Sequence, residues 1–273
     1  MCGRYVMARA TSDLVALGDA ETNEELVLRQ SWNVAPTAEV PILVAHADDV
    51  GAGVTRRIHV ARWGLVPPWA KELSVGSRAF NARSETVASK PTFRAAVRAR
   101  RCAVPVEGYY EWKAPEPGAK GPDGRAAKKQ SYYVHPAGAG DGEGPVIWFA
   151  GLYEWWQDPE AKAAGEDAWV LSTTILTMAA PDADDDDPVL AALGQLHDRL
   201  PVPMDAETMD RWLAPDTLGS AEEADALVGQ VCAGAYDVAA GWSLRPVGSA
   251  VGNVRNNGPE LIQEMREQQG TLL

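Results

Sequence analysis

Long apolar runs and closely spaced cysteines are both missing from this sequence of 273 residues. No stretch of about eighteen apolar residues occurs, and residues 1–7 lack the apolar segment and cleavage site of a signal peptide. Cys2, Cys102 and Cys232 are too few and too widely spaced for a disulfide framework or a typical zinc site. We therefore expect a cytoplasmic protein with reduced thiols, no bound metal and no membrane association.

The net charge of −13 argues against binding to nucleic acid, because basic side chains supply most of the non-specific affinity for DNA. The charge is uneven, however. Twelve basic and four acidic residues lie between Arg56 and Lys113, which gives this basic stretch a net charge of +8. The stretch could bind phosphates or merely solvate a surface. No phosphate-binding loop or metal-ligand cluster appears, so no cofactor is expected.

Strands dominate the middle of the chain, where short or alternating apolar runs lie between turn residues. The expected strands are 40–45, 57–63, 102–106, 131–135, 146–152 and 169–177. Helices are expected mainly near the ends of the chain. They are a turn at 13–15 capped by Ser12, helices 206–213 and 221–231 capped by Asp205 and Ser220, and a last helix from Pro259 to Gln268.

This order of elements predicts an α+β fold, because regular βαβ alternation is absent. A mixed or antiparallel, barrel-like β-sheet is expected as the core, with helices at its periphery. We expect a single domain over 1–273, with its core at about 2–262. Three stretches rich in Gly, Pro, Lys or Asp are expected to be loop insertions at the surface: 115–129, 136–145 and 182–187.

Cys2 is the residue whose chemical reactivity is clearest from the sequence. A small residue at position two lets the initiator methionine be removed, which leaves Cys2 with an α-amine beside its thiol. Reference pKa values of about 7.7–8.0 and 8.5 leave both groups partly nucleophilic near neutral pH. With an aldehyde, the amine forms an imine, and the thiolate then closes a five-membered thiazolidine on the same carbon. A cysteine without function at this position is the alternative.

Several short motifs follow Cys2 in a fixed order. They are W-G-L-V-P-P-W at 63–69, N-A-R-S-E-T at 81–86, R-C-A-V-P at 101–105, G-Y-Y-E-W at 108–112, H-D-R-L-P at 197–201 and V-G-N-V at 251–254. Together with M-C-G-R at 1–4, this set resembles the SRAP family, the SOS-response-associated peptidases also described as abasic-site processing proteins. The resemblance covers Cys2 to about Ile262 and implies the SRAP fold. It also implies a reversible thiazolidine crosslink between Cys2 and an abasic site in single-stranded DNA, in the DNA damage response.

The resemblance implies catalytic roles for three further residues. Asn81 would hold the α-amine or a sugar hydroxyl, with a structural asparagine in a turn as the alternative. Glu111 would shuttle protons, with Glu107 as the less favoured choice, and an exposed strand residue is the alternative. His197 would protonate the sugar ring oxygen and so favour the open aldehyde. Leu200 replaces the family's usual Met in the same motif, and we expect no loss of chemistry from this change.

A DNA-binding surface is also implied. Arg4, Arg78 and Arg83 would meet phosphates and Trp69 would stack on a base, whereas Trp63 is expected in the core. Pro36 and Thr177 match positions that resemble the family's DNA-facing wall. The carboxylates at 184–187 would weaken binding if their loop folded over the DNA. His46, His59 and His135 lie outside every motif and are expected to be ordinary surface or strand residues.

The expected partners are single-stranded DNA containing abasic sites and proteins of the replication fork. The protein would act as a monomer in the cytoplasm, on the nucleoid when bound to DNA. Strand cleavage by β-elimination stays open as a side activity. So do three other functions: an amino-terminal-nucleophile hydrolase resembling a glutamine amidotransferase, a cysteine protease whose activity is limited to releasing Met1, and a non-catalytic binder of single-stranded DNA.

Overall fold

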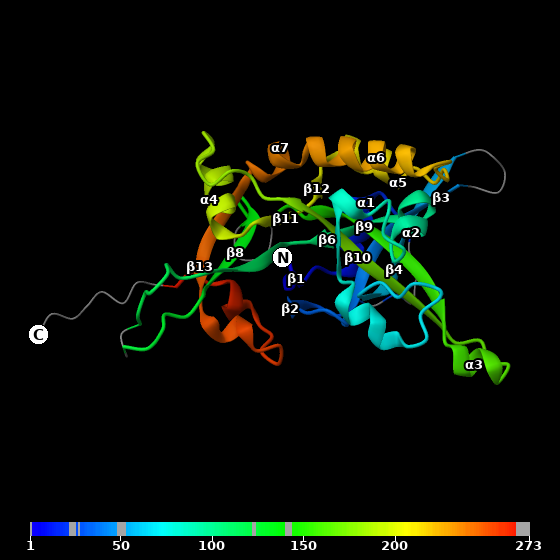
Figure 1. Cartoon of the computed structure of the whole chain (residues 1–273), viewed down its shortest axis with the longest axis horizontal. Coiled ribbons are helices and arrows are strands. Elements are labelled where there is room, and N and C mark those ends of the chain that lie inside the picture. Colours follow the sequence, from blue (N-terminus) through cyan, green and yellow to red (C-terminus); the bar gives the residue numbers. More distant parts are fainter. Residues whose placement is uncertain are drawn as a thin grey trace, which may run out of the picture.

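Two β-sheets form the centre of the molecule, and helices lie around them (Figure 1). The computed structural model describes residues 2–21, 26, 28–47, 53–121, 124–139 and 144–265. The expected α+β class, with a barrel-like core and peripheral helices, is confirmed.

Five strands of the larger sheet close into a barrel in the order β10-β4-β3-β6-β9, because β9 pairs again with β10. The pairings are antiparallel except for the parallel pair of β4 and β10. Three short strands, β5, β11 and β12, attach to β10 or β9. The bounds are β3 Glu39–Ala47, β4 Val54–Trp63, β5 Asn81–Arg83, β6 Arg101–Val106, β9 Ile147–Gln157, β10 Trp169–Ala179, β11 Arg199–Pro201 and β12 Pro203–Met204.

The smaller sheet has the order β13-β8-β7-β1-β2 and is antiparallel throughout. Its strands are β1 Tyr5–Met7, β2 Ser31–Val34, β7 Gly108–Lys113, β8 Gln130–Pro136 and β13 Trp242–Val247. Successive side chains of β7 enter different clusters, with Tyr109 in the main hydrophobic core and Tyr110 in a second cluster. Glu111 follows the alternation of Tyr109 and so belongs to the side of the main core.

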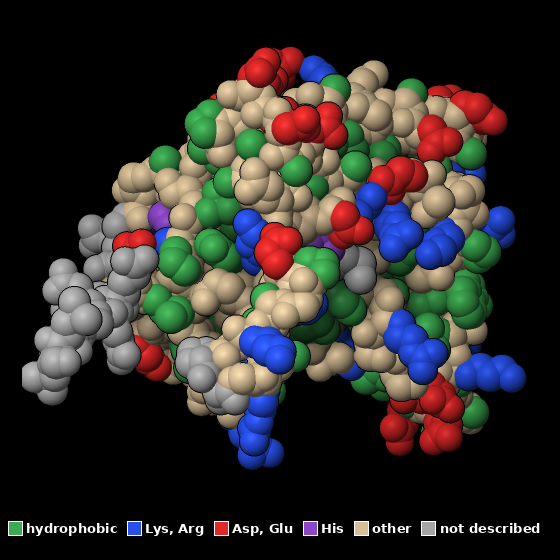
Figure 2. All heavy atoms as spheres, turned by 60° about the vertical axis from the view of Figure 1, so that its left-hand side comes forward, with side chains coloured by type: hydrophobic (Ala, Val, Ile, Leu, Met, Phe, Trp, Pro, Cys, Tyr) green, Lys and Arg blue, Asp and Glu red, His purple; other side chains and the backbone are tan. Residues whose placement is uncertain are grey.

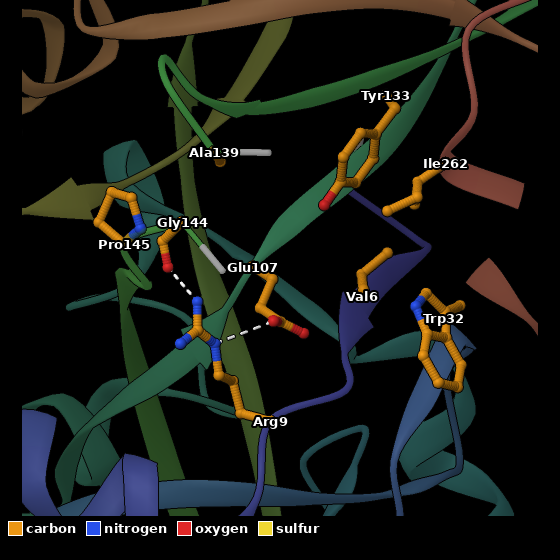
Figure 3. Close-up of a pocket in the computed structure, with 9 residues that line it drawn as sticks. All are labelled: Val6, Arg9, Trp32, Glu107, Tyr133, Ala139, Gly144, Pro145 and Ile262. Carbon is orange, nitrogen blue, oxygen red and sulfur yellow. Dashed lines mark hydrogen bonds and ion pairs between the residues drawn. The ribbon is translucent and has the colours of Figure 1, made fainter. Parts of the chain in front are cut away.

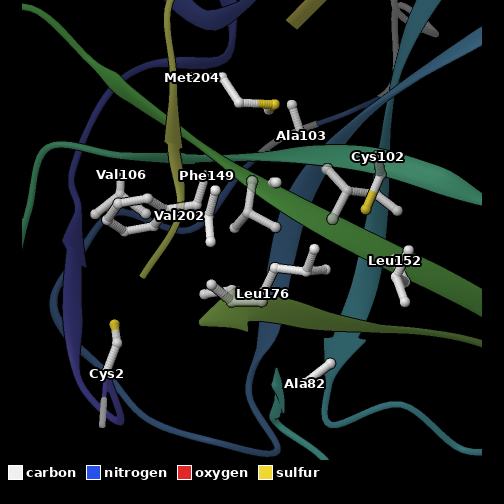
Figure 4. Close-up of a cluster of buried hydrophobic side chains, with 14 of the residues drawn as sticks. Cys2, Ala82, Cys102, Ala103, Val106, Phe149, Leu152, Leu176, Val202 and Met204 are labelled. Carbon is white, nitrogen blue, oxygen red and sulfur yellow. The ribbon is translucent and has the colours of Figure 1, made fainter. Parts of the chain in front are cut away.

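The main core runs from Cys2 to Trp242 and fills the space inside the barrel and between the two sheets. Figure 4 shows Cys2 at one edge of this cluster, well apart from Cys102. Trp63 is fully buried, as expected, and its indole donates a hydrogen bond of 2.9 Å to the Phe80 carbonyl.

The helices lie on the outside of the sheets. They are α1 Thr11–Gly18, α2 Arg94–Ala99, α3 Pro159–Ala163, α4 Pro188–Leu196, α5 Ala206–Leu213, α6 Ala221–Ala233 and α7 Ala235–Ala239, with 3-10 turns η1 Leu73–Arg78, η2 Ser84–Thr86, η3 Ser249–Gly252 and η4 Pro259–Ile262. No helix in the described part of the chain is long and apolar enough to cross a membrane.

Asp205 and Ser220 cap α5 and α6 as expected, since their side chains accept the N–H groups of Thr208 and Glu223. Two other helix predictions are wrong in part. Residues 13–15 are helical as expected, but Ser12 is not their cap, because α1 already begins at Thr11 and has no side-chain cap. The last helix is only the 3-10 turn η4, and residues 263–265 are not helical. Residues 266–268 of that prediction lie outside the described residues.

The acidic run at 182–187 is tied to the start of α4. Asp187 caps this helix by accepting the N–H groups of Val189 and Leu190 at 2.8 and 3.1 Å. Asp185 in turn accepts the Asp187 N–H at 2.9 Å. Part of this acidic run therefore has a structural role, which is to cap α4. The other two expected insertions lie partly outside the described residues, at 122–123 and 140–143.

Candidate active site

Asn81 anchors the backbone of Cys2. Its side-chain Nδ2 donates a hydrogen bond of 2.8 Å to the Cys2 carbonyl oxygen. Asn81 begins β5, which runs parallel to β10 and pairs with it from Ile175 onward. The other amide atom, Oδ1, is buried and accepts no hydrogen bond from the residues that the structure describes. Because a buried acceptor without a partner is costly, Oδ1 is suited to a donor that arrives with the chemistry, such as an amine or a sugar hydroxyl.

The Cys2 thiol and the Glu111 carboxylate lie close enough to interact electrostatically in a buried environment. Cys2 is fully buried and Glu111 is 5% exposed, and Glu111 Oε1 accepts the Trp112 N–H at 3.1 Å. Burial first, and the Glu111 charge second, raise the pKa of the Cys2 thiol to about 12. In the folded chain that still carries Met1, this shift runs against the expectation of a partly ionised thiol near neutral pH. The thiol must lose its proton while it reacts, and a carboxylate beside it can accept that proton.

His197 directly follows α4, a helix that packs against β7, the strand of Glu111. Its Nδ1 lies 2.7 Å from Asp198 Oδ1 and 3.0 Å from the Arg199 backbone nitrogen. A neutral ring can accept the Arg199 N–H at Nδ1, whereas a protonated ring can donate to Asp198 from the same atom. Asp198 and the Arg199 backbone N–H thus both contact Nδ1 and hold the ring in place.

Arg199 is a residue of this region whose importance sequence reasoning missed. Its guanidinium makes two bonds to the Glu85 carboxylate, at 2.5 and 3.0 Å, and a further bond of 2.6 Å to the Thr177 carbonyl. The hydrogen bonds from Arg199 lower the pKa of Glu85. Arg199 thereby ties β11 and β10 to η2, the turn that directly follows β5. The only signal in the sequence was its place in the motif H-D-R-L-P.

Glu107, the less favoured proton shuttle, faces a different small pocket (Figure 3). Its carboxylate accepts the Ala8 N–H at 2.5 Å and pairs with Arg9 Nε at 3.0 Å. Arg9 also donates to the Gly144 carbonyl. These contacts give Glu107 a structural role, and Glu111 is the carboxylate whose charge acts on the Cys2 thiol.

The residues predicted to bind DNA lie in different environments. Arg78 and Arg83 are exposed, and Trp69 is exposed over 62% of its surface. Arg78 also lines a pocket together with Asn81. Pro36 lines a separate groove, on the turn between β2 and β3.

Two predicted DNA contacts are engaged within the protein. Arg4 donates to Asn33 Oδ1 and to the Val251 carbonyl, each at 2.8 Å. Thr177 is fully buried, and its hydroxyl donates to the Ala82 carbonyl at 3.5 Å. The DNA contacts of all six residues stay predictions.

Several arginines of the basic stretch are committed to structural contacts. Arg56, Arg57 and Arg100 pair with Asp210, Glu21 and Glu154. Arg98 and Arg101 donate to backbone carbonyls around α5 and the start of α6. The positive surface is therefore smaller than the net charge of the stretch indicates. Figure 2 shows Lys and Arg side chains, together with a few acidic ones, around a hollow near the middle of one face. Asp and Glu are most numerous along the upper part of this face.

Comparisons with known proteins agree with the motifs. The family model of the SOS response associated peptidase (SRAP) matches residues 1–254. The chain is 30% identical over 264 residues to the abasic site processing protein YoqW of Bacillus subtilis (strain 168), covering 96% of this chain and 99% of the relative. It is 26% identical over 258 residues to the abasic site processing protein HMCES of Rattus norvegicus, covering 85% of this chain and 64% of that protein.

A solved structure shows the same fold. The crystal structure of a protein from Bacteroides thetaiotaomicron matches with a TM-score of 0.69 and 20% identity, over 97% of this chain and 100% of that chain. The ordered motifs, the family match and the shared architecture lead to one assignment. This chain belongs to the SRAP family.

Proposed function

We propose that this protein recognises abasic sites in single-stranded DNA and shields them through a reversible covalent bond to Cys2, formed after removal of Met1. The relatives YoqW and HMCES, both named abasic site processing proteins, support the substrate. The carrying observation is the setting of Cys2, whose carbonyl is held by Asn81 while its buried thiol interacts electrostatically with Glu111.

The proposed reaction joins the aminothiol to the ring-opened sugar. The α-amine of Cys2 adds to the aldehyde carbon, and the adduct loses water to give an imine. The thiol sulfur then adds to the same carbon while its proton passes to the imine nitrogen, so that aldehyde and aminothiol yield a thiazolidine and one water. The raised thiol pKa supports the amine as the first nucleophile, and the electrostatic interaction of Glu111 with the thiol supports Glu111 as the group that carries the later proton transfer.

Asn81 and His197 have supporting roles in this scheme. Asn81 Oδ1 accepts a hydrogen bond from the α-amine or from a sugar hydroxyl. His197 donates a proton to the sugar ring oxygen as the ring opens. Any peptidase activity is limited to release of Met1, and strand cleavage by β-elimination is a side reaction of the imine. The protein acts as a monomer in the cytoplasm, on DNA at replication forks.

The test is a crosslinking assay with protein whose amino terminus has been checked by mass spectrometry. An oligonucleotide with a single abasic site should give a slowly migrating crosslink band on a denaturing gel, and this band should survive heating. Cys2→Ala should abolish this heat-stable band. Cys102→Ala is the matched control, because Cys102 is equally buried and its thiol pKa is also raised to about 12. This control should crosslink like the wild type.

Two other outcomes would contradict the proposal. Glutaminase activity without a crosslink would favour an amino-terminal-nucleophile hydrolase. Salt-sensitive DNA binding that ignores both the lesion and Cys2 would favour a simple binder of single strands.

A further inference from the structure

The Tyr5 hydroxyl is buried without a hydrogen-bond partner. Tyr5 is fully buried in the main core, and its hydroxyl oxygen makes no hydrogen bond within the part of the chain that the structure describes. Such a group costs stability, because it has given up its hydrogen bonds to water and gained none in the fold. A partner that arrives only during the reaction would account for it.

The strand register places Tyr5 on the same side of the smaller sheet as Glu111. Tyr5 pairs directly with Tyr109 across β1 and β7, so the two side chains share one face of the sheet. Glu111 follows Tyr109 by two residues and therefore lies on that face as well. Cys2 and Tyr5 both belong to the main core, and Figure 4 shows the Cys2 side chain pointing into this core from its edge.

Packing fixes the Tyr5 ring relative to the residue that reacts. The ring centroid lies 4.9 Å from that of Trp63, at an interplanar angle of 57°. The Trp63 indole in turn donates to the carbonyl of Phe80. The next residue along the chain, Asn81, anchors the Cys2 carbonyl. Tyr5 is thus connected to Cys2 through this series of contacts as well as along the chain.

The Tyr5 hydroxyl also interacts electrostatically with the Cys2 thiol. Burial raises the pKa of Tyr5 well above its usual value, and the charge of an ionised Cys2 raises it further. Tyr5 therefore keeps its proton near neutral pH and can act as a hydrogen-bond donor. The sulfur needs donors, because burial and the Glu111 charge both oppose its ionisation, whereas a hydrogen bond with the Arg4 backbone favours it.

We propose that the Tyr5 hydroxyl donates a hydrogen bond to the Cys2 sulfur while this sulfur attacks the imine carbon, an inference that rests on the function proposed above. The thiol proton still passes to the imine nitrogen, and Tyr5 keeps its own proton throughout. The hydroxyl stabilises the negative charge that develops on sulfur, as the donors of an oxyanion hole do for oxygen. Catalytic hydrogen bonds often tighten only in the transition state, which agrees with a hydroxyl that has no partner before the reaction.

Tyr5→Phe tests the hydroxyl and keeps the ring that packs on Trp63. The single-turnover rate of the heat-stable crosslink should fall by about tenfold or more, because a hydrogen bond to a developing charge is lost. The melting temperature should stay the same or rise, since the variant removes an unpaired buried hydroxyl. A tyrosine that serves only packing would give the same melting temperature without any loss of rate.

Tyr110→Phe is the matched control. Tyr110 is equally buried but belongs to the second cluster, on the other face of the sheet. Its hydroxyl donates to the Trp32 carbonyl at 2.9 Å. The control should therefore lower the melting temperature and leave the crosslinking rate unchanged, which is the reverse of the result expected for Tyr5→Phe.

A second experiment isolates the step that precedes ring closure. Cys2→Ala keeps an α-amine and lacks the sulfur, and sodium cyanoborohydride reduces the imine of this variant to a stable amine. The rate of trapping then reports imine formation alone. Adding Tyr5→Phe to Cys2→Ala should leave this rate unchanged, because the proposed partner of the hydroxyl is absent.

Three outcomes would overturn the proposal. A wild-type crosslinking rate for Tyr5→Phe would show that the hydroxyl is not used. Slower imine trapping in the Cys2→Ala background would place its effect at the amine or the sugar. A loss of rate confined to Tyr109→Phe would assign the donor to the neighbouring tyrosine. Failure of the proposed function itself is distinct, since the wild type would then form no heat-stable band.

Discussion

Asn81 combines a donor that is already used with an acceptor that is still free. Its Nδ2 holds the Cys2 carbonyl, and its Oδ1 is buried without a partner in the described structure. Asn81→Asp keeps the shape and the acceptor but removes the donor, and it places a carboxylate against the Cys2 carbonyl oxygen. Leaving the partner of this part-buried hydrogen bond unsatisfied costs about 1–3 kcal/mol, so the single-turnover crosslinking rate should fall by about 5- to 150-fold.

A matched asparagine controls for the chemical change itself. Asn256 also donates from its side chain to a backbone carbonyl, that of Ala250 at 2.8 Å, but in an exposed loop. Asn256→Asp should leave the crosslinking rate unchanged. Equal rates for Asn81→Asp and the wild type would show that the anchor on Cys2 is not needed.

Cys102 links burial to the dependence of stability on pH. Burial raises the pKa of its thiol from 9.0 to about 12. Between these values the unfolded chain loses the proton that the folded chain keeps, so the thiol's contribution to stability is complete below pH 9 and is lost as the pH rises. In the wild type, this ionisation adds about 1 kcal/mol per pH unit to the fall in the free energy of unfolding between these pH values. Cys102→Ala removes that contribution, so the stability of the variant should fall less steeply with pH.

Urea unfolding at several pH values between 8 and about 11 measures this slope. The alanine lowers stability at every pH by leaving a small cavity, but that loss does not change with pH. Parallel curves for wild type and variant would show that the Cys102 thiol ionises normally in the fold.

Sequence motifs predicted which residues form the site, but they did not predict the pKa of the Cys2 thiol. Cys2, Asn81 and Glu111 lie in separate motifs, and the structure brings them together, although their catalytic roles stay predictions. The raised thiol pKa could not be foreseen, because it depends on how completely the two sheets cover Cys2. Arg199 was missed for a similar reason, since its partners come from η2 and β10, far away in the sequence.

At the scale of elements, α4 connects the acidic run to His197. Asp187 caps the start of this helix, and the N–H of His197 at its other end bonds to the Leu193 carbonyl at 3.2 Å. Loss of a helix cap costs about 1 kcal/mol. Asp187→Ala should therefore lower stability by about that amount and also slow crosslinking, because the helix that positions His197 loosens.

Ser220→Ala is the matched control for the cap variant, because Ser220 caps α6 in the same way. Thermal unfolding should show a similar loss of stability, while the crosslinking rate should stay at the wild-type level. If both cap variants slow crosslinking equally, the effect comes from general destabilisation and not from the position of His197.

The sequence predicted the strands whose own residues show a regular apolar pattern. All six expected strands are present, because each carries an apolar run long enough to show its period. Strands β1, β5 and β11 were missed, since each has only three residues and is defined by its pairing partner. Strand β7 was missed because both of its faces are buried, so its sequence lacks the alternation of polar and apolar residues.

At the scale of the whole molecule, a protein with an acidic net charge can still bind single-stranded DNA if its exposed arginines line the path of the DNA. Arg78 and Arg83 are exposed and flank Asn81, while other arginines of the basic stretch serve the fold. Each phosphate contact with single-stranded DNA contributes about 0.7 to the slope of log K against log salt. Replacing both residues by Gln should therefore reduce the magnitude of this slope by about 1.4.

Fluorescence anisotropy with an undamaged single-stranded oligonucleotide measures this slope without interference from the covalent reaction. Lys162→Gln serves as the control, because Lys162 is exposed on α3 at the tip of the long β9–β10 hairpin, away from the amino terminus (Figure 1). Its slope should equal that of the wild type. If the double variant keeps the wild-type slope, Arg78 and Arg83 do not contact phosphates, and the strand does not pass beside Asn81.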